Sequence, residues 1–101
     1  MYQYKAKVKR VVDGDTVDFD VDLGFHVIIR LRGRLLDVDT PERGHQDWAK
    51  ATVMLEVLLK EQEDEEGYVT IHTVKTGKYG RWLVDIEHVN TVLAEIWPYE
   101  R

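Results

Sequence analysis

Two neighbouring segments constrain the fold of this chain more than any other feature. Residues 16–23 alternate between apolar and mostly acidic side chains, and residues 27–35 alternate between aliphatic and arginine side chains. Such period-2 alternation is typical of β-strands with one buried face. The three residues between them, 24–26, begin with a glycine and can form a hairpin loop. We therefore predict an antiparallel hairpin with charges on one face and core residues on the other.

The length of this loop also predicts which residues of the two strands lie opposite each other. The expected cross-strand pairs are Asp18–Arg32, Asp20–Arg30, Phe19–Leu31 and Val21–Ile29. A slip by one residue would set acids against aliphatic side chains, so charge and hydrophobic pattern favour one register. Arg34 then faces Thr16 and has no acid directly opposite, so Arg34 is predicted to be unpaired.

The rest of the chain adds three strands and two helices. Alternation predicts strands over residues 2–12, 68–74 and 82–86, with Trp82, Val84 and Ile86 on one side of the last. Apolar residues at helical spacing predict an amphipathic helix of about four turns beginning near Trp48. A short helix over residues 89–97 ends before Pro98. This order predicts one α+β domain over residues 1–101, a five-stranded OB-type barrel with a helix between strands 3 and 4 and a short C-terminal helix.

Composition and charge limit the possible partners. The chain has no cysteine, which excludes disulfides and thiolate metal sites. No apolar run is long enough to cross a membrane and the N-terminus does not resemble a signal peptide, so we expect an intracellular protein and, by default, a monomer. The formal net charge of −5 weakens a nucleic-acid interpretation, yet the acids of residues 61–66 account for all of it.

Three short segments carry residues suited to chemistry, and each also has an ordinary structural interpretation. Residues 13–16 contain an Asp-Gly turn dipeptide. Residues 34–42 could begin a helix, with Thr40 as the N-cap and Pro41 at the first helical position. Residues 78–81 form a basic turn. The helix-start interpretation explains neither Arg34, a charge on the non-core face without an obvious partner, nor why Asp39 and Glu42 lie so close to the end of the arginine-bearing strand.

Taken together, these segments resemble the three signature segments of the staphylococcal nuclease (thermonuclease-like) family. They read Val-Asp-Gly-Asp-Thr-Val over 12–17, Arg-Leu-Leu-Asp-Val-Asp-Thr-Pro-Glu over 34–42 and Lys-Tyr-Gly-Arg over 78–81, in the family's order. The resemblance covers about residues 8–93. It is specific because three separated motifs and the fold between them agree.

The resemblance implies a role for each matching residue. Asp15 and Asp39 would bind Ca²⁺ through carboxylate oxygens, with the backbone carbonyl of Thr40 and water completing the shell. Glu42 would be the general base that activates a water. The remaining implied contacts are with phosphate: Arg34 and Arg81 on the scissile group in the transition state, and Lys78 and Tyr79 on a neighbouring one.

The implied activity is Ca²⁺-dependent hydrolysis of phosphodiester bonds in DNA and RNA, cutting at the 5′-oxygen and leaving 3′-phosphates. The loop after Glu42 is shorter than in the staphylococcal enzyme, which bears on how the base is held. Tyr99 is a candidate for the place of a tyrosine that the family carries near its C-terminal helix. The alternative is a non-catalytic OB module that binds nucleic acid or protein with a vestigial site. A peptide- or oligosaccharide-binding module rests on fold analogy alone.

Overall fold

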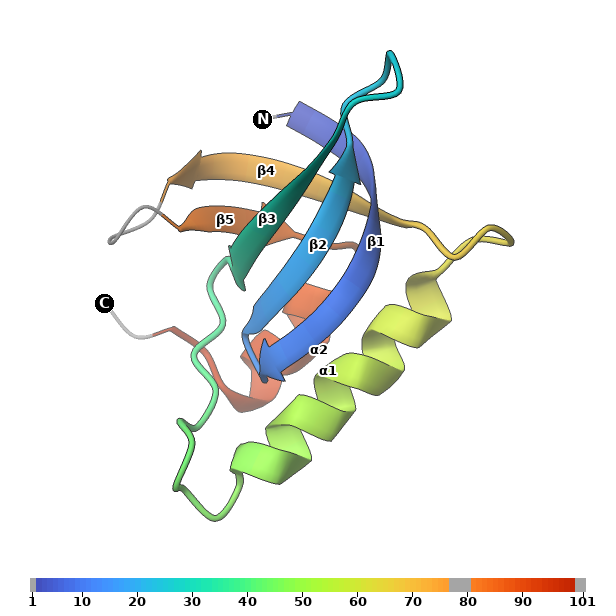
Figure 1. The fold of residues 1–101 in the computed structure, drawn as a ribbon. Helices are drawn as coiled ribbons and strands as arrows, with labels where there is room; N and C mark the ends of the chain where they lie inside the picture. The colour runs from blue at the N-terminus through green and yellow to red at the C-terminus, as the bar shows by residue number, and fades with distance from the viewer. Residues whose placement is uncertain (1, 77–80, 100–101) are drawn as a thin grey trace.

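The structure is a computed structural model that describes residues 2–76 and 81–99. Its elements in chain order are β1 (Tyr2–Asp13), β2 (Thr16–Asp22), β3 (Ile28–Leu35), α1 (Trp48–Gln62), β4 (Val69–Thr76), β5 (Trp82–Asp85) and α2 (Val89–Ile96). Figure 1 shows the strands wrapped into a barrel, with α1 lying along one side of it. Neither α1 nor α2 is long and apolar enough to cross a membrane.

The strands close in the order β1-β2-β3-β5-β4. The β3–β5 pair is parallel and the other pairs are antiparallel, so the barrel is mixed. One helix separates β3 from β4 and a short helix follows β5. The prediction of a five-stranded OB-type α+β barrel with these two helices is confirmed.

The β2–β3 hairpin has the predicted register. Asp18 pairs with Arg32, Asp20 with Arg30, Phe19 with Leu31, Val21 with Ile29 and Thr16 with Arg34. Both predicted Asp–Arg pairs are also salt bridges, and the Arg32 Nε lies 2.8 Å from the Asp18 Oδ1. The charge pattern of the two strands therefore sets the geometry of the barrel wall that leads to Arg34.

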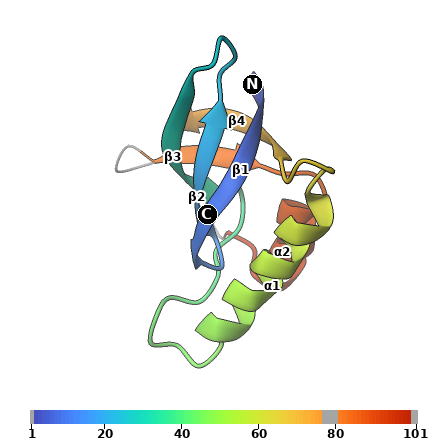
Figure 2. The same ribbon diagram turned by 45° about the vertical axis from the view of Figure 1, so that its right-hand side comes forward.

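The core lies inside the barrel and beneath α1 and α2. Its buried side chains come from every strand and both helices, and include Phe19, Leu35, Leu55, Ile71, Val84 and Leu93. In Figure 2, α1 and α2 lie together near the end of the barrel where β1 meets β2. Packing of the apolar faces of both helices on this end anchors the turns and loops around Arg34.

The helix predicted to begin near Trp48 does begin there. Two other interpretations differ from the structure: Thr40 as a helix N-cap, and Val27 and Ile29 as core residues on the face of Leu35. Thr40 is not a helix N-cap: residues 36–47 form a loop, and α1 begins at Trp48 after Asp47. Val27 and Ile29 are exposed although they share a face with the buried Leu35. In Figures 1 and 2 the β2–β3 loop projects past the barrel; Val27 and Ile29 lie near this loop, whereas Leu35 lies at the end of β3 that pairs with β5. Trp82 is likewise partly exposed, at the start of β5.

Candidate functional site

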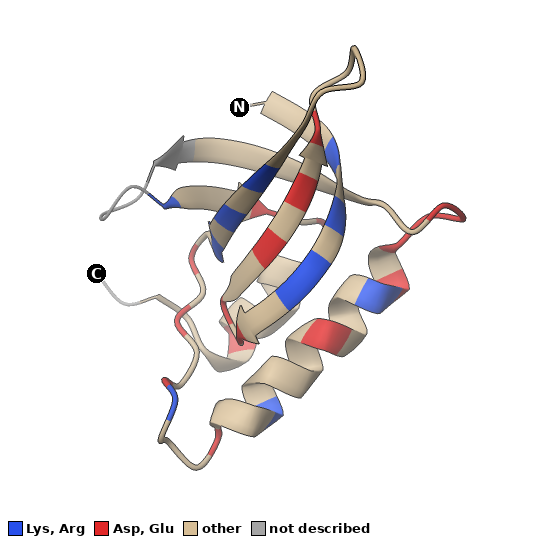
Figure 3. Cartoon of the chain, viewed as in Figure 1, with Lys and Arg blue, Asp and Glu red and all other residues tan. Residues whose placement is uncertain are grey.

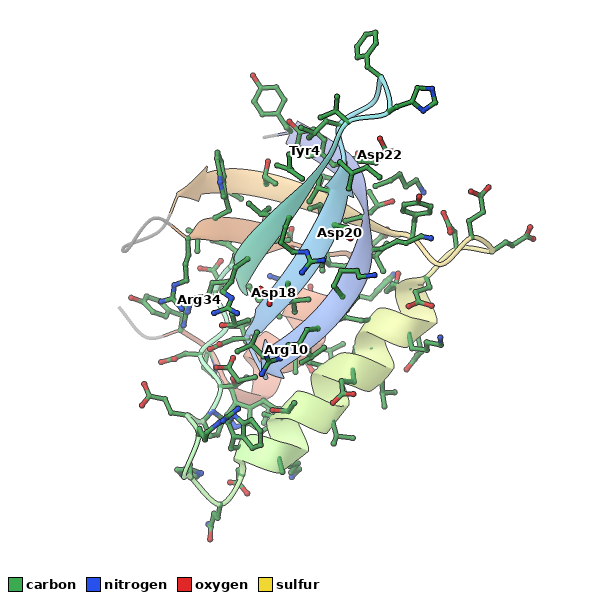
Figure 4. The ribbon with its side chains drawn as sticks, in the orientation of Figure 1. Tyr4, Arg10, Asp18, Asp20, Asp22 and Arg34 are labelled. Atoms are coloured by element: carbon green, nitrogen blue, oxygen red, sulfur yellow. The ribbon has the colours of Figure 1, made fainter. Side chains whose placement is uncertain are left out.

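Arg34, near the end of β3, is the centre of the candidate site. Its Nη2 lies 3.3 Å from the Asp39 Oδ1 and 3.5 Å from the Asp15 Oδ2. The prediction that Arg34 is unpaired is therefore wrong. Its partners come from the β1–β2 turn and from the loop after β3, whereas the cross-strand pattern shows only residues directly opposite. Figure 4 shows Arg34 at the end of β3 away from the hairpin loop.

Asp15 is the buried carboxylate of this site. Its Oδ1 accepts a hydrogen bond from the Thr16 hydroxyl at 3.0 Å, and its Oδ2 accepts one from the Thr40 backbone N–H at 3.2 Å. Its backbone carbonyl accepts a hydrogen bond from the Leu35 N–H at 2.8 Å. These bonds join the β1–β2 turn to the end of β3 and to the following loop, so Asp15 anchors two of the three candidate segments, residues 13–16 and 34–42.

Burial raises the pKa of Asp15 from 3.8 to about 6, chiefly because the charged form loses its hydration there. Asp13 adds to the rise through a hydrogen bond and its charge, whereas Arg34 and Thr16 act in the opposite direction. Asp13 also accepts a hydrogen bond from the Asp15 N–H at 3.2 Å. Sequence reasoning treated Asp13 only as a turn residue, although its position two residues before Asp15 indicated a local carboxylate pair.

Gly14 lets α1 and the 36–47 loop approach the β1–β2 turn closely. A Cβ on Gly14 would lie 2.7 Å from the Ala51 Cβ and 2.7 Å from the Thr40 Oγ1, which is too close for either contact. Thr40 is therefore pressed against the turn and is buried. Among the described residues its Oγ1 has no hydrogen-bond partner, although its backbone N–H is bonded to Asp15.

A second segment holds Asp39 from the other side. The Asp39 N–H donates to the Trp97 carbonyl at 2.9 Å, and the Tyr99 N–H donates to the Asp37 carbonyl at 3.0 Å. Val38 and Pro98 form a β-bridge between these contacts. The Tyr99 ring lies against the Arg34 guanidinium, with 5.2 Å from Cζ to the ring centroid. Sequence reasoning missed the role of Trp97, because a backbone carbonyl leaves no signal in the sequence.

The other predicted site residues are not joined to this cluster by any described contact. Glu42 is exposed in the 36–47 loop, and within residues 2–76 and 81–99 its carboxylate has no hydrogen bond or ion pair. Arg81 directly precedes β5, whose Leu83 pairs with Arg34, and it makes no salt bridge with the described residues. Lys78 and Tyr79 lie outside the described residues.

The oxygen atoms at this site match the chemistry of a hard divalent cation. Two carboxylate oxygens share the Arg34 Nη2, so their separation cannot exceed the sum of the two distances above. Calcium holds oxygen ligands at about 2.3–2.6 Å, so both carboxylates could serve one ion after a small movement. The described part of the chain contains no group of three or more acidic, histidine or cysteine side chains placed to hold a metal. A calcium ion would therefore depend on backbone oxygens and water as well as on Asp15 and Asp39.

A charged wall extends from the site along the outside of the barrel. Lys7 on β1 pairs with Asp20 on β2, which also pairs with Arg30 on β3. Figure 3 shows the result as basic bands on β1 and β3 on either side of the acidic band on β2. The basic side chains of β1 and β3 outnumber the acids of β2 on this wall, although the whole chain carries a formal net charge of −5.

The fold and this cluster define a small mixed barrel with a charged site where the β1–β2 turn, the end of β3 and the C-terminal segment meet. Comparisons with known proteins add no family to this description: no family model matches the chain, and no curated protein matches its sequence.

Proposed function

We propose that this protein is a Ca²⁺-dependent nuclease that hydrolyses phosphodiester bonds of DNA and RNA at the 5′-oxygen and leaves 3′-phosphates. The observation that carries the proposal is the meeting of Arg34, Asp15 and Asp39 at one end of the barrel. These residues come from two of the three segments that resemble the nuclease family. A barrel that served only as a scaffold would gain little stability from holding one arginine between two carboxylates of separate loops.

In the proposed reaction the protein supplies a base and charge for the transition state. Glu42 accepts a proton from a water that attacks phosphorus in line with the leaving 5′-oxygen. Arg34 and Arg81 donate hydrogen bonds to the phosphoryl oxygens, where negative charge is greatest in the transition state. Asp15, Asp39 and the Thr40 carbonyl would hold a Ca²⁺ ion, which would supply positive charge to the site.

For Arg34 to reach a phosphate it must loosen its contacts with Asp15 and Asp39. A bound cation would provide the alternative partner that these carboxylates require. The Tyr99 ring would keep the guanidinium plane oriented while its hydrogen-bonding groups change partners.

The test is cleavage of denatured DNA in calcium and in chelator. We expect 3′-phosphate ends to appear only with calcium. Glu42→Gln should lower the rate by about 100- to 10,000-fold because it removes the base. The matched control is Glu56→Gln, since Glu56 is exposed on α1, far from Arg34 in the chain, and has no assigned role. Cleavage that survives chelation, or a Glu42→Gln enzyme as fast as the wild type, contradicts the proposal.

The second candidate function is a non-catalytic OB module that binds nucleic acid. It is favoured by one observation: Arg34 is engaged by two carboxylates while the outer wall still offers basic side chains beside it. Such a module would bind single-stranded DNA with and without calcium and would leave it intact. Binding by Glu42→Gln that equals wild-type binding, with no cleavage by either protein, would favour this function over the nuclease.

A further inference from the structure

The turn that follows Glu42 is closed by hydrogen bonds of its own. The His45 N–H donates to the Glu42 carbonyl at 3.0 Å, and the Trp48 N–H donates to the His45 carbonyl at 3.1 Å. The Asp47 N–H donates to the His45 Nδ1 at 3.0 Å. These bonds give residues 42–48 a defined shape at the place where the chain turns from β3 back into α1 (Figure 1).

Arg43 lies over the Trp48 ring within this turn. Its Cζ is 5.0 Å from the ring centroid, and Arg43 is exposed whereas Trp48 is half-buried. Tryptophan is the aromatic side chain that attracts a cation most strongly. Among the described residues the buried Trp48 Nε1 has no hydrogen-bond partner, so packing holds the ring in place. The indole is therefore a platform for the guanidinium at the first residue of α1.

This stacking leaves the hydrogen-bond donors of Arg43 available. A ring beneath a guanidinium contacts its flat face, whereas its five N–H groups lie in the plane. Within residues 2–76 and 81–99 no carboxylate forms a salt bridge with Arg43, and this includes Glu42 and Asp47 of the same turn. Arg34 differs, because two carboxylates hold it. Arg43 can therefore bind a phosphate without first losing a carboxylate partner.

The position of Arg43 in the chain determines which phosphate it can reach. It directly follows Glu42, the residue proposed as general base, so their Cα atoms lie about 3.8 Å apart. The base must reach the scissile phosphate, whereas the Arg43 side chain is held on Trp48. A nucleic acid carries one phosphate per nucleotide, so a strand with one phosphate at Glu42 brings a second one to the neighbouring side chain.

We propose that Arg43, stacked on Trp48, binds the phosphate next to the scissile one on the side of the 42–48 turn. The inference rests on the proposed nuclease function and adds a substrate-binding residue to it. Its consequence is a preference for polynucleotide chains over diesters with a single phosphate. Because the contact is the same before and during the reaction, it lowers KM more than it raises kcat.

The test measures DNA binding separately from cleavage. A fluorescent thymidine oligonucleotide of about ten nucleotides suits the site size of an OB fold. Its anisotropy is recorded with calcium over a range of salt concentrations, in a Glu42→Gln background that keeps the DNA intact. Adding Arg43→Ala should weaken binding by about tenfold at low salt. It should also reduce the slope of log affinity against log salt by about 0.7, the value for one phosphate contact on a single strand.

Two further variants separate the charge of Arg43 from its geometry. Arg43→Lys should keep the salt slope and bind more weakly, because the charge remains while the bidentate fork is lost. Trp48→Phe should also keep the slope and weaken binding by severalfold, since phenylalanine attracts a cation less strongly. The indole N–H that it removes has no described partner, so the fold loses no described hydrogen bond.

The matched control is Lys60→Ala in the same background. It removes the same charge in the last turn of α1, about 18 Å from Trp48 at 1.5 Å per residue. Its affinity and slope should equal those of the background protein. Circular dichroism checks that every variant is folded, and kcat and KM are measured for Arg43→Ala in the otherwise wild-type chain.

Three results would overturn the role of Arg43. One is an Arg43→Ala variant whose affinity and slope equal those of Lys60→Ala. Another is an unchanged slope with a lower kcat, because Arg43 would then only shape the turn that carries Glu42. The last is a chain that neither binds nor cleaves DNA, which contradicts the nuclease as well. If the chain binds DNA without cleaving it, the nuclease proposal alone fails and the slope still decides the phosphate contact.

Discussion

Three arginines lie on one face of β3, and the two ends of the strand use them differently. Arg30 and Arg32 are 60% and 52% exposed, and each bonds to an aspartate directly opposite on β2. Arg34 is only 18% exposed, and its two carboxylate partners come from a turn and a loop. The comparison shows that residue type and strand pattern are the same at both ends while the surroundings differ.

The difference follows from what covers each end. The hairpin end projects into solvent, where the charge of an exposed pair is screened and contributes little to stability. The Arg34 end is closed by α1, the 36–47 loop and the C-terminal segment, which remove water from Asp15. Charge at the closed end can therefore act on a ligand, whereas charge at the hairpin end mainly fixes the register.

The largest expected effect comes from deleting the arginine at each end in turn. Arg34→Ala should reduce DNA cleavage by about 100- to 1,000-fold, the loss typical of a removed transition-state hydrogen-bond donor. It should also lower the free energy of unfolding by about 1 to 3 kcal/mol at pH 7.5, because Asp15 loses a charged partner. Arg32→Ala should change the cleavage rate by less than about threefold.

Arg34→Lys separates charge from geometry in this experiment. It should keep most of the stability, because the ammonium can still neutralise Asp15, and it should recover little of the rate, because the guanidinium fork is lost. If Arg32→Ala and Arg34→Ala slow cleavage equally, the distinction between the two ends of β3 does not hold for function.

The next effect is the pH dependence that Asp15 gives to stability. Its pKa is raised to about 6 in the folded chain from 3.8, so the folded state holds a proton that the unfolded state releases between these values. Wild-type stability from this group is full below about pH 4 and is lost as pH rises through about 6. Asp15→Asn removes that loss. In chelator the variant should be about 2 to 3 kcal/mol more stable than wild type at pH 7.5 and no more stable at pH 4.

Calcium should reverse this order if Asp15 is a ligand. Urea unfolding at pH 7.5 should show the wild type gaining stability with calcium concentration, because only the folded state assembles the site. Asp15→Asn should gain far less. If the free energies of unfolding of Asp15→Asn and the wild type differ by the same amount at pH 4 and at pH 7.5, the destabilisation by Asp15 does not come from its buried charge.

The sequence predicts the hairpin register well because each cross-strand pair repeats the same information. Asp18 with Arg32 and Phe19 with Leu31 require the same alignment, so an error in one would break the other. The partners of Arg34 could not be predicted in this way. Asp39 lies five residues further along the chain and is held by the Trp97 carbonyl, a tertiary contact with no pattern of its own.

The exposed half of the hairpin was mispredicted for a related reason. Alternation indicates that Val27, Ile29 and Leu35 share a face, and it does not indicate how far the opposing wall of the barrel extends. Leu35 is buried because β5 and the core reach it, whereas Ile29 lies beyond them. Similarly, Thr40 and Pro41 have the residue types of a helix start, yet the Thr40 N–H bonds to Asp15 and α1 begins at Trp48.

The smallest effect expected is at the hairpin end, where the Asp18–Arg32 pair is bidentate but exposed. The Arg32 Nε and Nη2 lie 2.8 and 3.1 Å from the two oxygens of Asp18, which lowers the pKa of that carboxyl. That stabilisation is present above the ordinary pKa of Asp18 and is lost as pH falls through the lowered value. Asp18→Asn should therefore reduce stability slightly at pH 7, and the difference from wild type should shrink toward zero as the pH falls below the lowered pKa of Asp18.

Salt distinguishes this pair from the Arg34 cluster. At an ionic strength of about 1 M the screening length is about 3 Å, so the effect of Asp18→Asn on the urea midpoint should largely disappear. The effect of Arg34→Ala should persist under the same conditions, because Asp15 is shielded from solvent ions by the Thr40 loop and α1. Equal salt sensitivity of the two variants would mean that the closed end of β3 excludes solvent no better than the open end. Burial would then not explain the raised pKa of Asp15.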